Sequence, residues 1–339
     1  MLIVLKQRND AALIHEIQEL LKKKYGCPSH VIGQNRRVIA VTGDTSGVEV
    51  SLIGSIEGVR SVDRVDRPYK LASREQKNRT VIRVRKDCVI GDPKNVVVIA
   101  GPCSIDSQSR LDETAAMAKA RGVKILRGGA FKPRTGPYSF QGLGEKGLKM
   151  IKRSGEKYGM ATISEIMKPE DIGLFEEYVD LLQIGARNMQ NYDLLKAVAK
   201  SRKPVMLKRG LAATLEELLL AAEYILSGGN PHVMLCERGI RTFEEEVRFT
   251  LCLGSVPALR ELTHLPILVD PSHAMGKMRW VKDAACGAVA VGADGLIIEI
   301  HPRPNESSCD SAQLLDREHW NDCMDAVTKV AKAVGKRIC

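Results

Sequence analysis

From residue 96 to the C-terminus, short apolar runs alternate with segments that have the apolar spacing of amphipathic helices. Eight runs have the length of buried strands: 96–100, 123–126, 160–163, 181–184, 204–207, 233–235, 267–269 and 296–300. The helical segments are 107–121, 145–158, 169–178, 191–201, 214–227, 242–262, 278–291 and 313–335. This alternation indicates parallel strands joined by crossover helices. Eight repeats in about 240 residues favour a closed (β/α)8 TIM barrel over an open doubly wound sheet.

Residues 1–70 have a different order of elements. Strands are expected at 2–5, 31–32, 38–41 and 59–65, and helices at 10–25 and 47–55. The order β-α-β-β-α-β is that of a ferredoxin-like split unit. The sequence therefore predicts an α/β barrel, residues 96–339, preceded by a small α+β ferredoxin-like (ACT-like) domain, residues 1–70. Residues 71–95 are expected to form a polar linker and an N-terminal hairpin, with strands at 80–84 and 87–90.

Composition excludes several classes of protein. No apolar run approaches the length of a transmembrane helix, and the first residues lack the basic leader of a signal peptide. Nine scattered cysteines without a Cys-x-x-Cys pair fit reduced thiols, so we expect a cytoplasmic protein that does not enter a membrane. The net charge of +10 suits nucleic acid, an acidic membrane or anionic substrates. Because aromatic residues make up only 4% and no nucleic-acid-binding motif is present, we expect no nucleic-acid partner.

The segment 126–136 predicts an anion-binding loop. It follows an apolar run and carries three cations, Arg127, Lys132 and Arg134, within eight residues. Gly and Pro residues keep the segment from forming a helix, and Thr135 adds a hydroxyl donor. The planar fork of Arg and the point charge of Lys both match phosphate or carboxylate oxygens. A solvated surface loop is the alternative, but cations held by stiff residues after a strand favour ligand binding.

Other cations follow other expected strands. In a TIM barrel the residues after each strand converge on one face, where active sites lie. The cations at these positions are Arg127, Lys132, Arg134, Arg187, Lys208, Arg209 and Arg238. So many like charges in one place would repel strongly unless anions lay among them. A substrate load of two phosphates and a carboxylate fits this set.

A second set of strand-end residues has the character of metal ligands. Cys103, His273, Glu299 and Asp310 offer a thiolate, an imidazole and two carboxylates. This mixture suits a divalent transition metal such as Zn, Mn, Fe or Co. His301 is a rival to His273 that spacing does not exclude. Cys309, which precedes Asp310, is a further thiol able to compete for the metal or to oxidise.

Taken together, the motifs resemble a known enzyme family. They are Gly101-Pro102-Cys103-Ser104, Lys132-Pro133-Arg134-Thr135, Ile184-Gly185-Ala186-Arg187, Leu207-Lys208-Arg209-Gly210, Cys236-Glu237-Arg238-Gly239 and Val269-Asp270-Pro271-Ser272-His273, with the run 138–144. They are similar to those of 3-deoxy-D-arabino-heptulosonate 7-phosphate (DAHP) synthases of the class I beta type, which carry an N-terminal ferredoxin-like regulatory domain. The resemblance covers essentially the whole chain.

The resemblance implies a metal-dependent, aldol-like condensation of phosphoenolpyruvate with erythrose 4-phosphate and water, the first step of the shikimate pathway. It implies that the residues around phosphoenolpyruvate are Arg127, Lys132, Glu165, Ala186 (through its backbone), Arg187, Lys208 and Arg238. Arg134 and Thr135 would hold the phosphate of the aldose. The implied metal, which is Mn, Co, Zn, Fe or Cd, would bind Cys103, His273, Glu299 and Asp310.

Lys132, Cys103 and His273 are the expected catalytic residues. We expect Lys132 to protonate the aldehyde oxygen, with a pKa lowered by the neighbouring cations. The resemblance also implies a homotetramer, and tyrosine or phenylalanine as an inhibitor that binds the N-terminal domain.

Two rival functions are open at this point. A 3-deoxy-manno-octulosonate 8-phosphate synthase would use arabinose 5-phosphate, but its loop typically reads Lys-Ala-Asn-Arg-Ser where this chain has Lys132-Pro133-Arg134-Thr135. The N-terminal domain also points away from it. A non-catalytic sugar-phosphate sensor would share the cations but would not need the Cys, His, Glu and Asp set.

Overall fold

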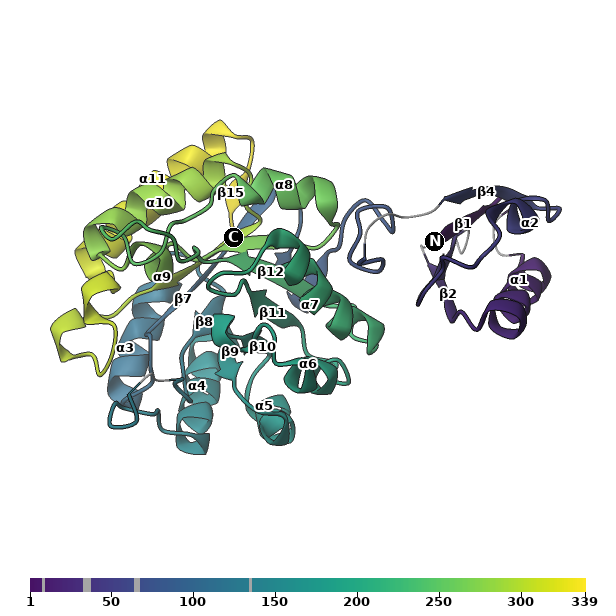
Figure 1. Cartoon of the computed structure of the whole chain (residues 1–339). Helices are drawn as coiled ribbons and strands as arrows, with labels where there is room; N and C mark the ends of the chain where they lie inside the picture. Colours follow the sequence, from purple (N-terminus) through teal and green to yellow (C-terminus); the bar gives the residue numbers. More distant parts are fainter. Residues whose placement is uncertain (8–9, 33–37, 64–67, 134–135) are drawn as a thin grey trace. The chain divides into compact units, whose positions relative to one another are not determined.

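A computed structural model describes residues 1–7, 10–32, 38–63, 68–133 and 136–339, which form two compact units, Met1–Asn78 and Arg79–Cys339 (Figure 1). The first unit extends beyond the domain limit of residue 70 expected from the sequence. Tyr69 and Ala72 are buried, and the Lys70 ammonium donates a hydrogen bond to the Val41 carbonyl. Arg79 pairs with the Asp294 carboxylate and thus starts the second unit.

The first unit has the predicted order of elements. These are β1 (Leu2–Leu5), α1 (Ala11–Tyr25), β2 (Ser29–Ile32), β3 (Val38–Val41), α2 (Val50–Gly54) and β4 (Val59–Asp63). The strands form one sheet in the order β2-β3-β1-β4 with antiparallel neighbours. Helix α1 begins after Asp10, whose carboxylate accepts a hydrogen bond from the Leu13 amide, and it ends at Gly26 in the left-handed conformation (φ 64°). The sheet and helices share one apolar core.

The second unit begins with the predicted hairpin, β5 (Ile82–Arg85) and β6 (Cys88–Ile90), and continues as a closed barrel. The barrel strands are β7 (Asn95–Gly101), β8 (Ile125–Arg127), β9 (Ala161–Ile166), β10 (Leu181–Ile184), β11 (Val205–Lys208), β12 (Val233–Glu237), β13 (Ile267–Val269) and β14 (Gly295–Glu299). All neighbours are parallel, and β14 pairs with β7. The predicted TIM barrel is therefore confirmed. An unpredicted short strand, β15 (Arg337–Ile338), also pairs with β7.

Helices surround the strands in Figure 1. They are α3 (Gln108–Lys119), α4 (Glu145–Tyr158), α5 (Ile172–Tyr178) after the 3-10 turn η1 (Pro169–Asp171), α6 (Tyr192–Val198), α7 (Leu215–Ser227), α8 (Ser255–Leu262), α10 (Met278–Ala290) and α11 (Arg317–Ala333). Four short elements that follow barrel strands were not predicted: η2 (Ala186–Asn188), α9 (Pro271–Met275), η3 (Pro304–Glu306) and η4 (Ser311–Gln313).

The helix predicted at 242–262 was wrong over its first half. Residues 242–254 are irregular, and α8 starts only at Ser255. The backbone of Thr250 exchanges hydrogen bonds with Ile240 at 3.0 Å, and the Phe249 amide donates to the Ala274 carbonyl at 2.9 Å. Because these groups are satisfied by other segments, the residues gain nothing from the i→i−4 bonds of a helix.

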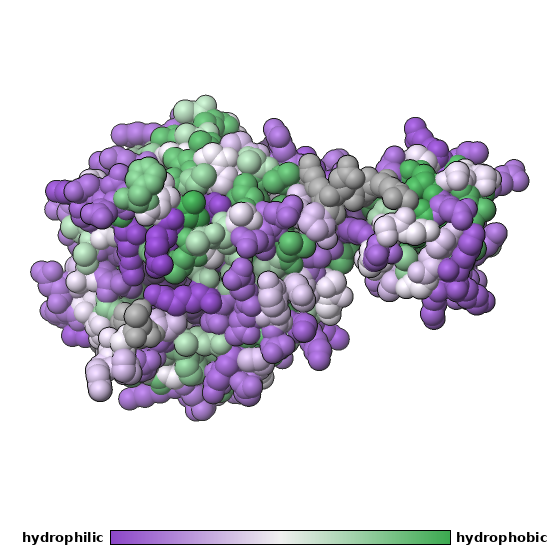
Figure 2. Space-filling model, viewed as in Figure 1, coloured by the Kyte–Doolittle hydropathy of each residue, from purple (hydrophilic) through white to green (hydrophobic). Residues whose placement is uncertain are grey.

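The strand side chains fill the barrel interior. Ile99, Ile163, Met206, Met234 and Ile297 belong to one buried cluster with residues from the other strands. Strands buried on both faces match the continuous apolar runs of the sequence. Figure 2 shows hydrophilic residues over much of the visible face of this larger unit. Across the part of the chain that is described, no helix has both the length and the apolar character needed to span a bilayer.

Candidate functional site

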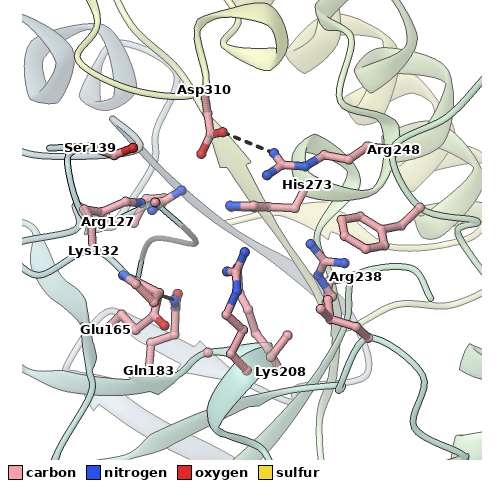
Figure 3. A pocket seen from close by; sticks show the side chains of 17 residues that line it. Arg127, Lys132, Ser139, Glu165, Gln183, Lys208, Arg238, Arg248, His273 and Asp310 are labelled. Atoms are coloured by element: carbon pink, nitrogen blue, oxygen red, sulfur yellow. Dashed lines mark hydrogen bonds and ion pairs between the residues drawn. The ribbon is translucent and has the colours of Figure 1, made fainter. Parts of the chain in front are cut away.

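A polar cavity of about 270 Å³ lies beyond the carboxyl ends of the barrel strands (Figure 3). Its lining comes from seven barrel strands, β8 to β14, or from the segments that follow them, and includes Arg127, Lys132, Glu165, Gln183, Ala186, Arg187, Lys208, Arg238, Arg248, His273 and Asp310. Figure 3 shows Arg127, Lys132 and Glu165 on one side, and His273, Arg238 and Arg248 on the other. Among the described lining residues, six cations face two carboxylates. The cavity therefore favours anionic ligands.

Three of the described cations lack a carboxylate partner: Arg187, Arg238 and Lys132, whose ammonium contacts Cys103 instead. Within the described part of the chain, no acidic group lies within ion-pair distance of Arg187 or Arg238. Arg238 is only 5% exposed, and its guanidinium stacks 3.8 Å from the centre of the Phe249 ring. Burial lowers the pKa of Arg238 to about 10. A buried, unpaired guanidinium is costly, so an anion bound in this cavity would stabilise it.

Lys208, Asp270 and His273 form a connected network at the ends of β11 and β13. The Lys208 ammonium donates to Asp270 Oδ2 at 2.5 Å, and His273 Nδ1 lies 2.7 Å from the same oxygen. Asp270 is also the N-cap of α9, since it accepts a hydrogen bond from the His273 amide at 2.9 Å. Burial alone would raise the pKa of Asp270, but its interactions with His273 and with the Lys208 ammonium hold it well below its usual value.

Asp270 also sets the tautomer of His273. An ionised carboxylate only accepts hydrogen bonds, so the imidazole carries its proton on Nδ1. Nε2 is then free of a proton and lies 3.4 Å from Glu299 Oε1. Burial lowers the pKa of His273, which favours the neutral ring. A neutral imidazole oriented by a carboxylate is typical of a metal ligand.

Glu299, at the end of β14, is completely buried, and both of its carboxylate oxygens have partners. One carboxylate oxygen pairs with Arg127 Nη1, and the other accepts from Gln313 Nε2 at 2.5 Å. Burial alone would raise the pKa of Glu299, but its interactions with His273, Arg127 and Lys132 lower it strongly. The carboxylate is therefore ionised at neutral pH.

Cys103 lies behind the cavity wall, in contact with three polar groups. Its sulfur is 3.1 Å from Asp310 Oδ2, 3.0 Å from the Lys132 ammonium and 3.0 Å from the Cys309 sulfur. Because the two sulfurs share a hydrogen bond, loss of one proton is favoured and loss of the second is opposed. The pKa of Cys309 falls to about 6, and that of Cys103 rises well above its usual value.

The donor set fits a divalent transition metal. The ligand atoms of His273, Glu299 and Asp310 lie within 4.8 Å of one another, and so do those of Cys103, Cys309 and Asp310. All four predicted ligands thus belong to two groups that share Asp310. His301, the rival of His273, belongs to neither group. Its Nδ1 instead accepts a hydrogen bond from the Arg303 amide at 3.0 Å.

The expected low pKa of Lys132 is wrong. Burial does lower the pKa, but interactions with Cys103, Cys309 and the Glu299 carboxylate outweigh burial and the neighbouring Arg127, and the net shift is upward. The sequence showed the cations after the strands but not the thiols that lie beneath Lys132. The residue is therefore a firmly charged ammonium in this structure.

Arg209 was expected among the cations of the site but does not line the cavity. Its guanidinium donates to Glu237 Oε2 at 2.7 Å and to the Ala213 carbonyl at 2.8 Å. It thus belongs to a buried structural pair. Arg134 and Thr135, the expected residues for the aldose phosphate, lie outside the described residues.

Sequence reasoning missed three polar residues of the site. Gln183 lies in the middle of β10, and its Nε2 donates a hydrogen bond to Glu165 Oε2 at 3.2 Å. Because the rest of this run is apolar, the run predicted only a buried strand and no site residue. Arg248 Nη1 contacts Asp310 Oδ1 at 3.2 Å and Gln313 Oε1 at 2.8 Å. Arg248 lies in the segment wrongly predicted as helix, and Gln313 ends the short 3-10 turn η4, which was not predicted. No sequence pattern places such residues in a site.

Models of two protein families match the chain. The DAHP synthetase I family matches residues 76–335, and the DAHP synthase ferredoxin-like domain matches residues 1–67. The phospho-2-dehydro-3-deoxyheptonate aldolase of Thermotoga maritima is 44% identical over 339 residues, which is all of both chains. The 2-dehydro-3-deoxyphosphooctonate aldolase of Desulfotalea psychrophila is 29% identical over 73% of this chain and 94% of its own length.

Solved structures agree with these matches. The crystal structure of the Thermotoga maritima phospho-2-dehydro-3-deoxyheptonate aldolase (DAHP synthase) has a TM-score of 0.80 and 45% identity, covering 100% of this chain and 99% of that one. A truncated form of 3-deoxy-D-arabino-heptulosonate 7-phosphate synthase from the same organism has a TM-score of 0.75 and 44% identity. The match covers 80% of this chain and 99% of the truncated form.

Proposed function

This chain belongs to the DAHP synthetase I family, and from that premise we propose that it condenses phosphoenolpyruvate with erythrose 4-phosphate and water, releasing DAHP and phosphate. The observation that carries the proposal is the meeting of two sets of residues in one cavity. Unpaired cations and metal-type ligands face each other across a space of about 270 Å³. A phosphate-binding sensor would need the cations alone.

The cations are suited to hold phosphoenolpyruvate. We propose that Arg127, Lys132, Glu165, Arg187, Lys208, Arg238 and the Ala186 backbone surround it. Arg187 and Arg238 have no carboxylate partner among the described residues, so their charges are available to an anion. The Lys208 ammonium, in contrast, is positioned by its hydrogen bond to Asp270. Fixed cations in a partly dry cavity stabilise the charge that develops when C3 of the enol attacks the aldehyde, water adds at C2 and the C–O bond to phosphate breaks.

Lys132 is the proposed proton donor to the aldehyde oxygen. Its ammonium is held by the Cys103 carbonyl oxygen at 3.2 Å and the Cys103 sulfur at 3.0 Å. With a raised pKa it carries its proton at neutral pH and stabilises the developing alkoxide before transfer. For the phosphate of the aldose we propose Arg134 and Thr135, because a guanidinium and a hydroxyl that follow Lys132 closely in the sequence suit a second anion.

Activity is proposed to depend on a divalent metal held by Cys103, His273, Glu299 and Asp310. The buried, ionised carboxylate of Glu299, the neutral His273 and the shared Asp310 support this set. Such a metal would polarise or orient the aldehyde oxygen, or activate the attacking water. Treatment with a chelator is expected to abolish turnover, and Mn²⁺, Co²⁺ or Zn²⁺ to restore it. Full activity of the metal-free enzyme would remove the metal from the proposal.

The preferred sugar phosphate distinguishes the proposed function from that of a 3-deoxy-manno-octulosonate 8-phosphate synthase. Phosphate release from phosphoenolpyruvate should be at least tenfold faster with erythrose 4-phosphate than with arabinose 5-phosphate. The 2-dehydro-3-deoxyphosphooctonate aldolase of Desulfotalea psychrophila matches the chain at lower identity and over less of its length than the heptonate aldolase does, which supports a preference for erythrose 4-phosphate. A preference for arabinose 5-phosphate would assign the rival activity instead.

The N-terminal unit is the proposed regulatory element. Its match to the DAHP synthase ferredoxin-like domain supports binding of an effector, for which we propose tyrosine or phenylalanine. Inhibition would arise because the effector binds better to an arrangement with a less active barrel. A homotetramer and a cytoplasmic location complete the proposal, the latter supported by nine cysteines that are all free.

A further inference from the structure

We propose that Cys309 is a fifth ligand-bearing residue of the metal site, and that with Cys103 it gives the site a two-sulfur corner that favours thiophilic cations. The inference rests on the proposed metal dependence and goes beyond its four-residue set. It concerns which cation the site selects and how many sulfurs hold that cation.

The Cys309 sulfur lies in contact with two polar groups of the site. It lies 3.0 Å from the Cys103 sulfur and 2.9 Å from Ser104 Oγ, and both cysteines are buried. Cys103, Cys309 and Leu314 form a small buried cluster, so little water reaches this corner. The ligand atoms of Cys103, Cys309 and Asp310 all lie within 4.8 Å of one another.

The backbone is shaped so that consecutive residues reach the same sulfur. Asp310 has a φ of 51°, the one left-handed value found among the described non-glycine residues. In this conformation its carboxylate contacts Cys103 Sγ at 3.1 Å, while Cys309 contacts that same sulfur from the preceding position. A hydrogen bond from Ser307 Oγ to the Cys309 carbonyl at 2.8 Å fixes the loop. Strained backbone of this kind persists where the surroundings enforce it, often at binding sites.

Two sulfurs that would each lie about 2.3 Å from one Zn²⁺ ion are at most about 4.6 Å apart. The two sulfurs, 3.0 Å apart, are therefore within reach of one cation. The Lys132 ammonium, 3.0 Å from Cys103 Sγ, offsets the negative charge of the thiolates. Both requirements of a two-sulfur corner, reach and charge balance, are thus met.

Ligand softness then predicts the selectivity. Thiolates favour Cd²⁺ and Zn²⁺, whereas Mn²⁺ prefers carboxylate and water oxygens. A second sulfur should therefore raise the affinity for Cd²⁺ much more than that for Mn²⁺. The competing interpretation makes Cys309 a small buried side chain that merely donates a weak hydrogen bond. Under that interpretation, its removal leaves Cd²⁺ binding unchanged.

The test uses the full-length, reduced, metal-free protein titrated with Cd²⁺ and, separately, with Mn²⁺. Cys309→Ser and Cys309→Ala are compared with the wild type. Cys252→Ser, a change outside the site at a half-buried cysteine, is the matched control. The ultraviolet thiolate-to-Cd²⁺ charge-transfer band counts the bound sulfurs. We expect both Cys309 variants to show about half of the wild-type band and at least tenfold weaker Cd²⁺ binding, with Mn²⁺ affinity changed less than threefold.

An unchanged band in the Cys309 variants would overturn the inference while leaving the metal dependence intact. A wild-type protein that binds neither cation would overturn both. If neither Cys309 variant folds, X-ray absorption at the zinc edge of the Zn²⁺-loaded wild type decides. Two sulfurs around zinc support the inference, and one sulfur refutes it.

Discussion

Asp270 holds Lys208 and His273 in place, so its replacement by Asn tests the network directly. Asn is as good an N-cap as Asp, and α9 keeps its cap in Asp270→Asn. The variant therefore loses only the negative charge of the buried carboxylate. The Lys208 side chain, which is 5% exposed, would then keep its ammonium charge without a carboxylate partner. Breaking such a pair from one side costs about 3–5 kcal/mol, and we expect the lower end because the amide oxygen still accepts a hydrogen bond. For a unit of this size that lowers Tm by about 6–12 °C.

Metal binding should weaken in the same variant. An amide does not fix the Nδ1–H tautomer of His273 as a carboxylate does, and losing such a partner typically reduces metal affinity 10–100-fold. Asp316→Asn is a matched control, because Asp316 caps α11 and contacts His319 Nδ1 at 2.8 Å with the same i,i+3 spacing, but at the surface. Scanning calorimetry and Mn²⁺ titration measure both effects. Equal losses in the two variants, or normal metal binding by Asp270→Asn, would refute the reasoning.

The pH dependence has a definite sign. The folded-state pKa of Asp270 is depressed, so its contribution to stability is present above the unfolded-state pKa of about 3.9 and is lost as the pH falls below it. In metal-free protein, the gap in Tm between wild type and Asp270→Asn should therefore be constant above about pH 5 and shrink toward pH 3. A gap that widens on acidification would contradict this account.

Three further outcomes are expected. Gly185→Ala would place a Cβ 1.9 Å from Glu165 Oε1, so kcat/KM for phosphoenolpyruvate should fall about 10–100-fold, whereas Gly173→Ala, with open space around it, should change nothing. Arg134→Ala should raise the KM for erythrose 4-phosphate about tenfold more than that for phosphoenolpyruvate, and equal effects in steady-state kinetics would show that the loop is misassigned. Removal of residues 1–78 should preserve turnover and abolish inhibition by tyrosine or phenylalanine, and inhibition that survives would locate the effector site on the barrel.

The barrel was predictable because its strands are buried on both faces. Runs such as 181–184 and 267–269 coincide with β10 and β13, since a continuous apolar run has few other uses in a globular chain. The placement of polar residues after each strand follows from the topology once the barrel is known. That reasoning brought Arg127, Lys208, Arg238 and His273 to one cavity.

What could not be predicted depends on contacts distant in sequence. Arg209 follows Lys208 directly, yet it does not line the cavity, because its guanidinium pairs with the buried carboxylate of Glu237, 28 residues further along the chain. The upward shift of the Lys132 pKa depends on thiols 29 and 177 residues away in the chain. No local pattern reports such neighbours, and the sequence alone could not choose the sign of the shift.

The most direct test of the central claim is a reaction in ¹⁸O-labelled water with phosphoenolpyruvate, erythrose 4-phosphate and the metal-loaded enzyme. Condensation with C–O cleavage predicts equal amounts of DAHP and phosphate, with the label at C2 of the sugar and none in the phosphate. Mass spectrometry of both products reads the result. Labelled phosphate, or phosphate released without erythrose 4-phosphate, would mean that the cavity hydrolyses phosphoenolpyruvate and would contradict the account.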